Sequence, residues 1–444
     1  MKKYEKYKRI IKMLFCVVQL LLLVSIYSFL WIGYYNKVTL YPFFRRGNWL
    51  MIFIYTILLA FFMQLYGGFK VGYLKKGNLI YSQILAVFFT NAITYLQIAA
   101  LNKAFMSPLP LLGLLIAEAL LITVWTTAFQ WIYSGIFPPR KMLLITGDRS
   151  DYHLMDKINA REDKYVIEKT VNYRRGIERL IPEIQKYDGV IIGDMPSHER
   201  NLILKYCFQN SIRSYSVPKI SDILLKSSHE LKLFDSPLLL SRNMGLSVEQ
   251  LFVKRLIDIV GSFIGIVVSL PFFIIIAICI KLTDRGPVFY TQTRLTKDGE
   301  PFKIYKFRTM VQNAEKDGIP RLAANGDPRI LPIGRLLRRT RLDELPQIYN
   351  IFKGEMSLVG PRPERPELVE EFTAEIPEFP CRMKVKAGLT GYAQVYGKYN
   401  TTPYDKLKLD LTYIRNYSVF LDLKLIFMTP KILFLKESTE GVQS

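Results

Sequence analysis

The segment LIDIVGSFIGIVVSLPFFIIIAICIKL, residues 256–282, decides the fold because its 27 residues are almost all apolar. A helix needs only about 20 such residues to cross a bilayer. Pro271 near the middle removes a helical hydrogen bond and kinks the axis. Lys254-Arg255 before the segment, Lys281 at its end and Arg285 after it favour the cytoplasmic side at both ends. The residues alone leave two interpretations open, a kinked spanning helix and a helix that enters the membrane and returns.

Four more apolar runs precede this segment and predict a transmembrane region over residues 1–135. Each has the roughly 20 residues that a spanning helix needs. The runs lie at about 10–32, 49–69, 80–101 and 109–133. Basic residues cluster before the first run, after the second and after the fourth, so we expect these three places in the cytoplasm. The first run is too long for an ordinary signal peptide and has no small-residue cleavage site after it.

Composition limits the classes of partner. The chain has 444 residues, 50% of them hydrophobic, and a formal net charge of +22. The hydrophobic fraction excludes a disordered chain. The positive net charge points to anionic lipids, nucleic acid or phosphorylated ligands as partners. We expect no nucleic-acid partner, because the charge flanks hydrophobic segments and no nucleic-acid motif appears. Four cysteines without a CxxC pair and three dispersed histidines predict neither a disulfide framework nor a zinc site.

Residues 140–245 are expected to form a Rossmann-like α/β module. Short apolar runs alternate with helical patterns, which is typical of a doubly wound parallel sheet. The expected elements are KMLLITG (141–147), a helix at 176–187, DGVIIG (188–193), a helix at 198–210 and RSYSV (213–217). Gly147 is not part of a GxGxxG motif, so no dinucleotide site is predicted. We interpret the module as structural or regulatory.

An arginine-rich stretch and an acidic pair follow the long apolar segment. Five arginines and no acid lie between Arg329 and Arg341, interleaved with leucine and isoleucine. Such a stretch fits an interfacial helix or a wall that binds phosphate. Asp343-Glu344 follows, just before Pro346, where we expect a short helix that Gly354 ends. A carboxylate can bind Mg²⁺ or attack phosphorus. For an isolated pair, however, the favoured interpretation is that Asp343 caps the helix and Glu344 is solvated.

Six motifs in one order within residues 250–444 resemble the bacterial sugar transferase family, the monotopic phosphoglycosyl transferases. They are KRLIDIVGS, GPVFYTQTR, FKIYKFRTM, RRTRLDELPQ, KGEMSLVGPRP and VKAGLTGYAQV. The preceding part resembles the large members, the polyprenyl-phosphate hexose-1-phosphate transferases. The resemblance implies four transmembrane helices, a Rossmann-like module and a monotopic, α-rich catalytic domain in which 256–282 is a re-entrant membrane helix. It also implies the bacterial cytoplasmic membrane, with the catalytic domain on the cytoplasmic face among membrane lipids.

The resemblance further implies a reaction. A sugar 1-phosphate would pass from a UDP-sugar to undecaprenyl phosphate through a covalent aspartyl-phosphosugar intermediate, with release of UMP. This step initiates the synthesis of an exopolysaccharide, capsule or O-antigen repeat unit. Asp343 matches the family's nucleophile, and Glu344 matches its partner, which is assigned to Mg²⁺ binding.

The resemblance also implies roles for other residues. Lys306, Arg308 and Arg338 match substrate phosphate-binding positions. Pro361, Arg362 and Pro363 match the motif placed at the nucleotide. Ser269 and Pro271 mark the break of the membrane hairpin. Here Leu270 separates them, whereas many members have adjacent Ser-Pro, and this departure bears on the hairpin geometry and not on the chemistry.

Two rival classes of protein make different demands on the sequence. A processive membrane glycosyltransferase would need motifs such as DxD and QxxRW, which are absent. A non-enzymatic membrane receptor would leave the acidic pair and the arginines without a role. No residue selects the sugar, so UDP-glucose or UDP-galactose rests on the architecture alone. The role of the α/β module and the oligomeric state, a homodimer included, stay open.

Overall fold

The structure is a computed structural model that describes residues 2–147, 152–232, 235–241, 245–312, 327–397 and 401–433. It divides into two compact units, Met1–Pro218 and Lys219–Ser444. The boundary between the two units, at residue 218, lies inside the range 140–245 that was predicted for the α/β module. Each unit is described by itself below.

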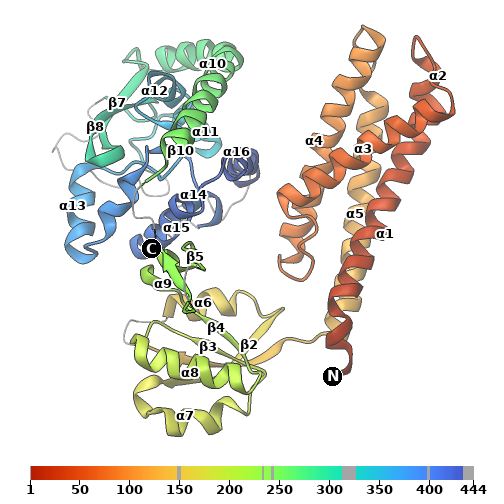
Figure 1. Cartoon of the computed structure of the whole chain (residues 1–444). Coiled ribbons are helices and arrows are strands. Elements are labelled where there is room, and N and C mark those ends of the chain that lie inside the picture. Colours follow the sequence, from red (N-terminus) through yellow and green to blue (C-terminus); the bar gives the residue numbers. More distant parts are fainter. Residues whose placement is uncertain are drawn as a thin grey trace. The chain divides into compact units, whose positions relative to one another are not determined.

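Four long helices open the first unit and run side by side in Figure 1. They are α1 Lys8–Leu30, α3 Arg45–Tyr66, α4 Lys76–Asn102 and α5 Leu109–Ile136, with a π-helical turn Trp31–Tyr35 and the short α2 Asn36–Val38 after α1. All four are long and apolar enough to cross a membrane. Phe29 and Trp131 are among many exposed apolar side chains on their outer faces. Helices that are apolar all round are typical of a membrane protein.

Polar side chains are buried between these helices. Glu118 of α5 accepts hydrogen bonds from the Tyr55 hydroxyl at 2.5 Å and from the Asn91 amide at 2.7 Å. Gln19 of α1 and Gln83 of α4 exchange hydrogen bonds of 2.9 and 3.1 Å. Because lipid offers no partner to a polar group, these contacts fix each helix against its neighbours.

The rest of the first unit is a four-stranded parallel sheet in the order β2-β1-β3-β4. Its elements are β1 Arg140–Thr146, α6 Tyr152–Asn159, β2 Tyr165–Asn172, α7 Ile177–Ile184, β3 Gly189–Ile192, α8 Ser197–Gln209 and β4 Arg213–Ser216. The sequence did not predict β2, because this edge strand buries only Val171 fully and so shows no apolar run. The two central strands, β1 and β3, are the apolar runs that were predicted.

The second unit is mainly helical. Its helices are α9 Ile220–Lys226, α10 Val248–Asp284, α11 Pro332–Thr340, α12 Gln347–Lys353, α13 Pro366–Glu375, α14 Tyr392–Tyr396, α15 Pro403–Arg415 and α16 Val419–Leu433. Three two-stranded sheets pair β5 His229–Leu231 with β6 Leu238–Leu240, β7 Phe289–Leu295 with β8 Pro301–Phe307, and β9 Ser357–Val359 with β10 Gly388–Thr390.

Residues that follow Pro218 belong to this second core. Ile223 of α9 is buried in the same cluster as Leu407 and Leu411 of α15. The Arg415 guanidinium donates to the Ser227 hydroxyl at 2.8 Å. Tertiary packing therefore joins α9 to the second unit, although its sequence follows the α/β module directly.

Helix α10 contains the apolar segment that decides the fold. It begins with a capping box between Ser247 and Gln250 and continues for 37 residues with Pro271 inside. Figure 1 shows that α10 changes direction along its length. A proline within a helix is a common cause of such a bend, since its ring displaces one hydrogen bond.

Both arms of α10 pack on the second unit. Before Pro271, a Cβ at Gly261 would lie 2.6 Å from the Leu358 side chain, so the helix backbone is close to β9 there. After Pro271, Ile280 is buried in a cluster with Phe307 of β8. Six apolar side chains around Pro271 are more than half exposed, and they are Val267, Val268, Leu270, Phe272, Ile274 and Ile275. Both ends of the helix therefore pack on the second unit, and apolar side chains around its proline are exposed.

Candidate active site

The acidic pair lies in a tight turn between two helices. Helix α11 ends at Thr340, its C-cap Arg341 adopts the left-handed conformation with φ 55°, and Leu342–Glu344 then form a single 3-10 turn. Pro346 is the N-cap of α12, and Gly354 ends that helix with φ 96°, within one residue of the predicted bounds. Neither carboxylate caps α12, since its cap makes no side-chain hydrogen bond.

Glu344 is buried and neutralised. Its carboxylate accepts a hydrogen bond from Lys306 Nζ at 3.0 Å and two from the Arg362 guanidinium at 2.5 and 3.3 Å. Burial alone would raise the pKa of Glu344, but the charges of Arg362 and Lys306 outweigh burial and hold this pKa far below its ordinary value. Glu344 is therefore a fixed anion that orients two cations.

Asp343 has the opposite environment. Its side chain is half-buried, and no hydrogen bond or ion pair joins it to another residue that the structure describes. Burial and the neighbouring Glu344 charge raise the pKa of Asp343 from 3.8 to about 6, against the attraction of Lys306 and Arg338. A carboxylate with few partners and a raised pKa is more basic than usual, and hence a better nucleophile when ionised.

Arg338 reaches the site from α11. Its Nε donates to the Thr309 hydroxyl at 2.8 Å, which orients the guanidinium, and its charge acts on Asp343. The other face of α11 buries Leu337 against Phe307, and it leaves Leu336 more than half exposed. The arginine-rich stretch is thus an amphipathic helix that contributes to the site.

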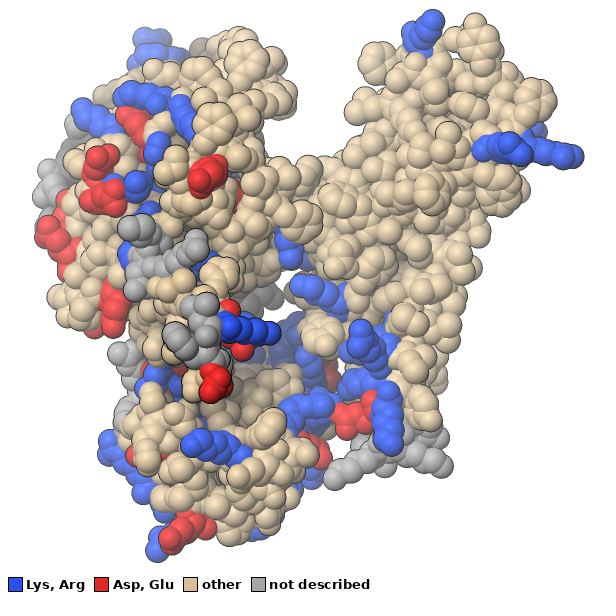
Figure 2. Space-filling view, viewed as in Figure 1, with Lys and Arg blue, Asp and Glu red and all other residues tan. Residues whose placement is uncertain are grey.

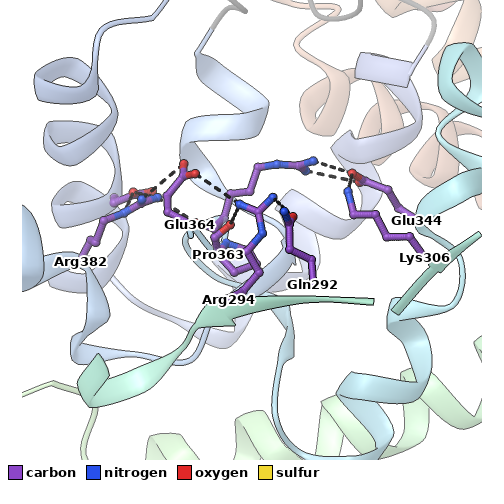
Figure 3. A network of polar contacts seen from close by, with 9 residues as sticks. Gln292, Arg294, Lys306, Glu344, Pro363, Glu364 and Arg382 are labelled. Atoms are coloured by element: carbon purple, nitrogen blue, oxygen red, sulfur yellow. Dashed lines mark hydrogen bonds and ion pairs between the residues drawn. The ribbon is translucent and has the colours of Figure 1, made fainter. Parts of the chain in front are cut away.

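A chain of polar contacts holds the Pro361–Pro363 loop in place (Figure 3). Arg294 donates to the Pro363 carbonyl at 3.2 Å, and Arg382 donates to the Arg362 carbonyl at 3.1 Å. Gly388 N–H donates to the Pro361 carbonyl at 2.9 Å. These contacts fix the backbone on both sides of Arg362, so its guanidinium points toward Glu344.

The structure separates Arg308 from this cluster. Although Arg308 lies only two residues after Lys306, its guanidinium forms a double ion pair with Asp284 at the end of α10. Its Nε also donates to the Pro287 carbonyl at 2.6 Å. In this arrangement Arg308 ties α10 to β8, and its role as a phosphate ligand stays a prediction.

Ser269 and Pro271 lie within α10. The Ser269 side chain is buried, and its hydroxyl donates to the Ile266 carbonyl at 3.3 Å. Neither residue belongs to the contacts around Glu344, which agrees with a role in the shape of the helix and not in chemistry.

Sequence reasoning missed the structural roles of two charged residues in α10. Lys254 of α10 is buried and pairs with Asp422 of α16 at 2.7 Å. One turn later, Asp258 accepts hydrogen bonds from the Ser357 hydroxyl at 2.9 Å and the Leu358 N–H at 2.8 Å. Charged residues four apart at the start of an apolar helix were the available signal, because such groups are costly to bury unless they are paired.

The donor set permits a small divalent cation. No group of three histidine, cysteine, aspartate or glutamate side chains suited to a metal occurs among the described residues. Mg²⁺ is nevertheless commonly held by one or two carboxylates together with water and substrate phosphates. Asp343 and Glu344 supply such oxygens. Asp343 is the more available donor, since Lys306 and Arg362 already occupy Glu344.

Taken together, fold and site define a membrane-associated protein with a carboxylate pair set among cations, the arrangement expected of an enzyme that acts on phosphorylated substrates. A family model described as "Bacterial sugar transferase" matches residues 249–436. The chain is 49% identical over 133 residues to a putative undecaprenyl-phosphate N-acetylgalactosaminyl 1-phosphate transferase of Bacillus subtilis. These residues make up 30% of this chain and 74% of that protein. The chain belongs to the bacterial sugar transferase family, as its motifs predicted.

Larger relatives match over less of their length. A UDP-N-acetylgalactosamine-undecaprenyl-phosphate N-acetylgalactosaminephosphotransferase of Aeromonas hydrophila is 42% identical over 181 residues, 40% of this chain and 43% of the relative. A UDP-glucose:undecaprenyl-phosphate glucose-1-phosphate transferase of Klebsiella pneumoniae is 34% identical over 262 residues, 58% of this chain and 54% of the relative. The chain therefore matches about half the length of these relatives, and their names differ in the sugar.

Proposed function

We propose that this protein transfers a sugar 1-phosphate from a UDP-sugar to undecaprenyl phosphate and releases UMP. The observation that carries the proposal is the contrast within the acidic pair. Asp343 has no described partner and a pKa raised to about 6, whereas the adjacent Glu344 is held by Lys306 and Arg362. The names of the relatives supply the lipid acceptor and the UDP-sugar donors.

In the first half-reaction, an Asp343 oxygen attacks the phosphorus that carries the sugar. A bond forms between this oxygen and phosphorus, and the phosphorus bond to the bridging oxygen of the diphosphate breaks, so UMP leaves with the electron pair. In the second half-reaction, a phosphate oxygen of undecaprenyl phosphate attacks the same phosphorus and Asp343 is released. Two successive substrates can thus use one site, with ping-pong kinetics.

The neighbouring cations suit this chemistry. Phosphoryl transfer spreads negative charge over the nonbridging oxygens in the transition state. Lys306, Arg338 and Arg362 are fixed by Glu344, Thr309 and the Pro361–Pro363 loop before any substrate binds. Cations that are already oriented need little reorganisation when this charge develops.

Mg²⁺ is part of the proposal. Glu344, together with Asp343, would hold it, and its chemistry would be to neutralise diphosphate charge. Glu344 could keep its hydrogen bonds from Lys306 and Arg362 while it holds the ion, because a carboxylate has about four acceptor sites.

We also propose that α10 is re-entrant and that the active site faces the cytoplasm. Both arms of α10 pack on one compact unit, and Asp284 at its end pairs with Arg308 of that unit. A helix that crossed the membrane would put its ends on opposite sides, roughly 30 Å apart. In intact cells, cysteines placed beside Lys254 and Arg285 should both be protected from an impermeant reagent. Labelling from outside next to Arg285 would contradict the proposal.

Product analysis tests the reaction itself. Purified protein supplied with undecaprenyl phosphate, Mg²⁺ and a panel of UDP-sugars should release UMP with at least one of them. Release of UDP would instead indicate glycosyl transfer. With a UDP-sugar labelled in the phosphate next to the sugar and no lipid acceptor, label should remain on wild-type protein and be absent from Asp343→Asn.

A further inference from the structure

A second cationic site lies in the first unit. A cavity of about 740 Å³ is lined by the start of α1, the end of α5 and the adjoining edge of the α/β module. Seven of its lining residues are lysine or arginine and two are acidic. In Figure 2, Lys and Arg side chains gather where the helical bundle joins the module, whereas most of the bundle surface is tan.

The two acids of this cavity are already paired. Glu5 forms ion pairs with Arg140 and with Arg213, the latter at 3.4 Å. Asp163 pairs with Arg161 at 2.8 Å. The remaining positive charge of the cavity is therefore not balanced by these acids.

Three lysines of the cavity face aromatic rings. Lys8 lies 4.6 Å from the centroid of the Phe137 ring, Lys12 lies 4.6 Å from that of Tyr73, and Lys164 lies 4.8 Å from the same Tyr73 ring. None of the three forms an ion pair with a carboxylate in the described part of the chain. A ring face attracts a cation but leaves its charge and its N–H donors available to a ligand.

The partial burial of these lysines also favours the binding of an anion beside them. All three lysines are half-buried, and burial, followed by the charge of Arg161, lowers the pKa of Lys164. Gly72 with φ 70° brings the loop between α3 and α4 close, since a Cβ there would lie 2.9 Å from Lys12 Nζ. The lysines thus line one open cavity from α1 and from the module.

The size and position of the cavity limit the class of ligand that it could bind. Small-molecule pockets are commonly about 300–1,000 Å³, so the volume suits a phosphorylated metabolite or a lipid headgroup. The apolar part of α1 begins beside Lys8 and Lys12, and α5 ends at Ile136, so the cavity lies where apolar helices give way to a polar module. Phosphate groups are abundant at that level of a membrane.

We propose that this cavity binds a phosphate-bearing ligand through Lys8, Lys12 and Lys164. The site belongs to the first unit and is separate from Asp343 in the second. The ligand's phosphate comes either from an anionic phospholipid or from a soluble compound. Binding there would order the module against the helical bundle, because the lysines come from both.

The test uses the full chain in nanodiscs of phosphatidylcholine, with pyrophosphate as the probe in titration calorimetry. The double variant Lys12→Gln/Lys164→Gln is compared with wild type and with Lys75→Gln/Lys205→Gln, which removes the same charge at exposed positions outside the cavity. Wild type and control should show one more pyrophosphate site than the double variant, or a site that is about tenfold tighter. Lys8→Gln alone serves as a second variant if the double variant fails to fold.

A second arm identifies the source of the phosphate. In nanodiscs that contain phosphatidylglycerol, wild type should lose the extra pyrophosphate site if the lipid headgroup occupies the cavity, and should keep it if the natural ligand is soluble. Native mass spectrometry then counts the phosphatidylglycerol molecules that stay on each protein. Equal pyrophosphate binding and equal lipid counts in wild type, double variant and control would overturn the proposal.

Discussion

The cations of the two cationic sites of this protein have different partners. In the second unit, the buried carboxylate of Glu344 holds Lys306 and Arg362, and the neighbouring Asp343 stays without a described partner. In the first unit, aromatic rings face the lysines, and the acids are paired with arginines. A carboxylate fixes the direction of a cation and lowers the local potential, whereas a ring leaves the potential high. The first arrangement suits catalysis and the second suits binding.

Replacing the nucleophile should have the largest effect. Asp343→Asn removes the attacking carboxylate, so UMP release should fall roughly 10⁴-fold or more. The variant should unfold at the same temperature as wild type or above it, because a pKa raised to about 6 means that the Asp343 charge costs folding free energy at neutral pH. The exposed Asp298 provides the matched control as Asp298→Asn. Unchanged UMP release by Asp343→Asn would refute the covalent mechanism.

Glu344→Gln should reverse the sign of the stability effect. Lys306 and Arg362 would keep their charges and lose their shared carboxylate, so we expect the free energy of unfolding to fall by about 2 kcal/mol. Turnover should drop about 100-fold, since the cations lose their orientation. Activity and thermal unfolding are measured beside the exposed control Glu300→Gln. If Asp343→Asn and Glu344→Gln both lower the free energy of unfolding, the two carboxylates do not have the opposite environments that we infer.

The pH dependence should separate the same two carboxylates. Since Asp343 must be ionised to attack, kcat/KM should rise with pH through about 6, the pKa of Asp343, and fall tenfold per unit below it. Ionisation of Asp343 weakens the fold as pH rises from 3.8 to about 6. Glu344 has a lowered pKa, so its stabilising effect is complete above 4.5 and is lost as pH falls below that value. A pH–rate profile without an acidic limb near 6 would contradict this assignment.

A shortened chain tests whether the second unit works alone. A chain that starts at Lys219 keeps Ile223 in the core and the contact between Arg415 and Ser227. A chain that starts at Ser247 loses both. We expect the longer one to retain transfer within about tenfold of wild type in detergent with Mg²⁺, and the shorter one to be less stable by about 2 kcal/mol. No covalent intermediate on Asp343 in a folded Lys219 chain would mean that the first unit completes the active site.

The smallest catalytic effect is expected in the first unit. Without added anions, Lys12→Gln/Lys164→Gln should transfer sugar phosphate within about twofold of wild type, because both changes lie outside the catalytic unit and remove no described ion pair. UMP release at saturating substrate is the measurement. A large loss of activity would show that the two cationic sites are coupled.

Part of the local structure around the site was readable from the sequence. The short helix between Pro346 and Gly354 lies within one residue of its predicted bounds, whereas the left-handed Arg341 that begins the turn of Leu342–Glu344 was not predicted. The family was recognisable because six motifs occur in one order, and the comparisons confirm it. The partners of the cations were not readable, since contacts such as that of Arg362 with Glu344 join residues 18 positions apart through a folded loop.

The sequence by itself determined the apolar helices, the central strands of the α/β module and the family, because hydrophobic periodicity and motif order are local properties of a chain. Tertiary structure alone decided three matters. It assigned α9 to the second unit through the burial of Ile223. It directed Arg308 to Asp284 and Lys306 to Glu344, although only one residue separates the two cations. It left the Asp343 side chain without a hydrogen bond or ion pair to another described residue. It also raised the pKa of Asp343, because this pKa depends on burial and on the summed charge of all the neighbouring side chains.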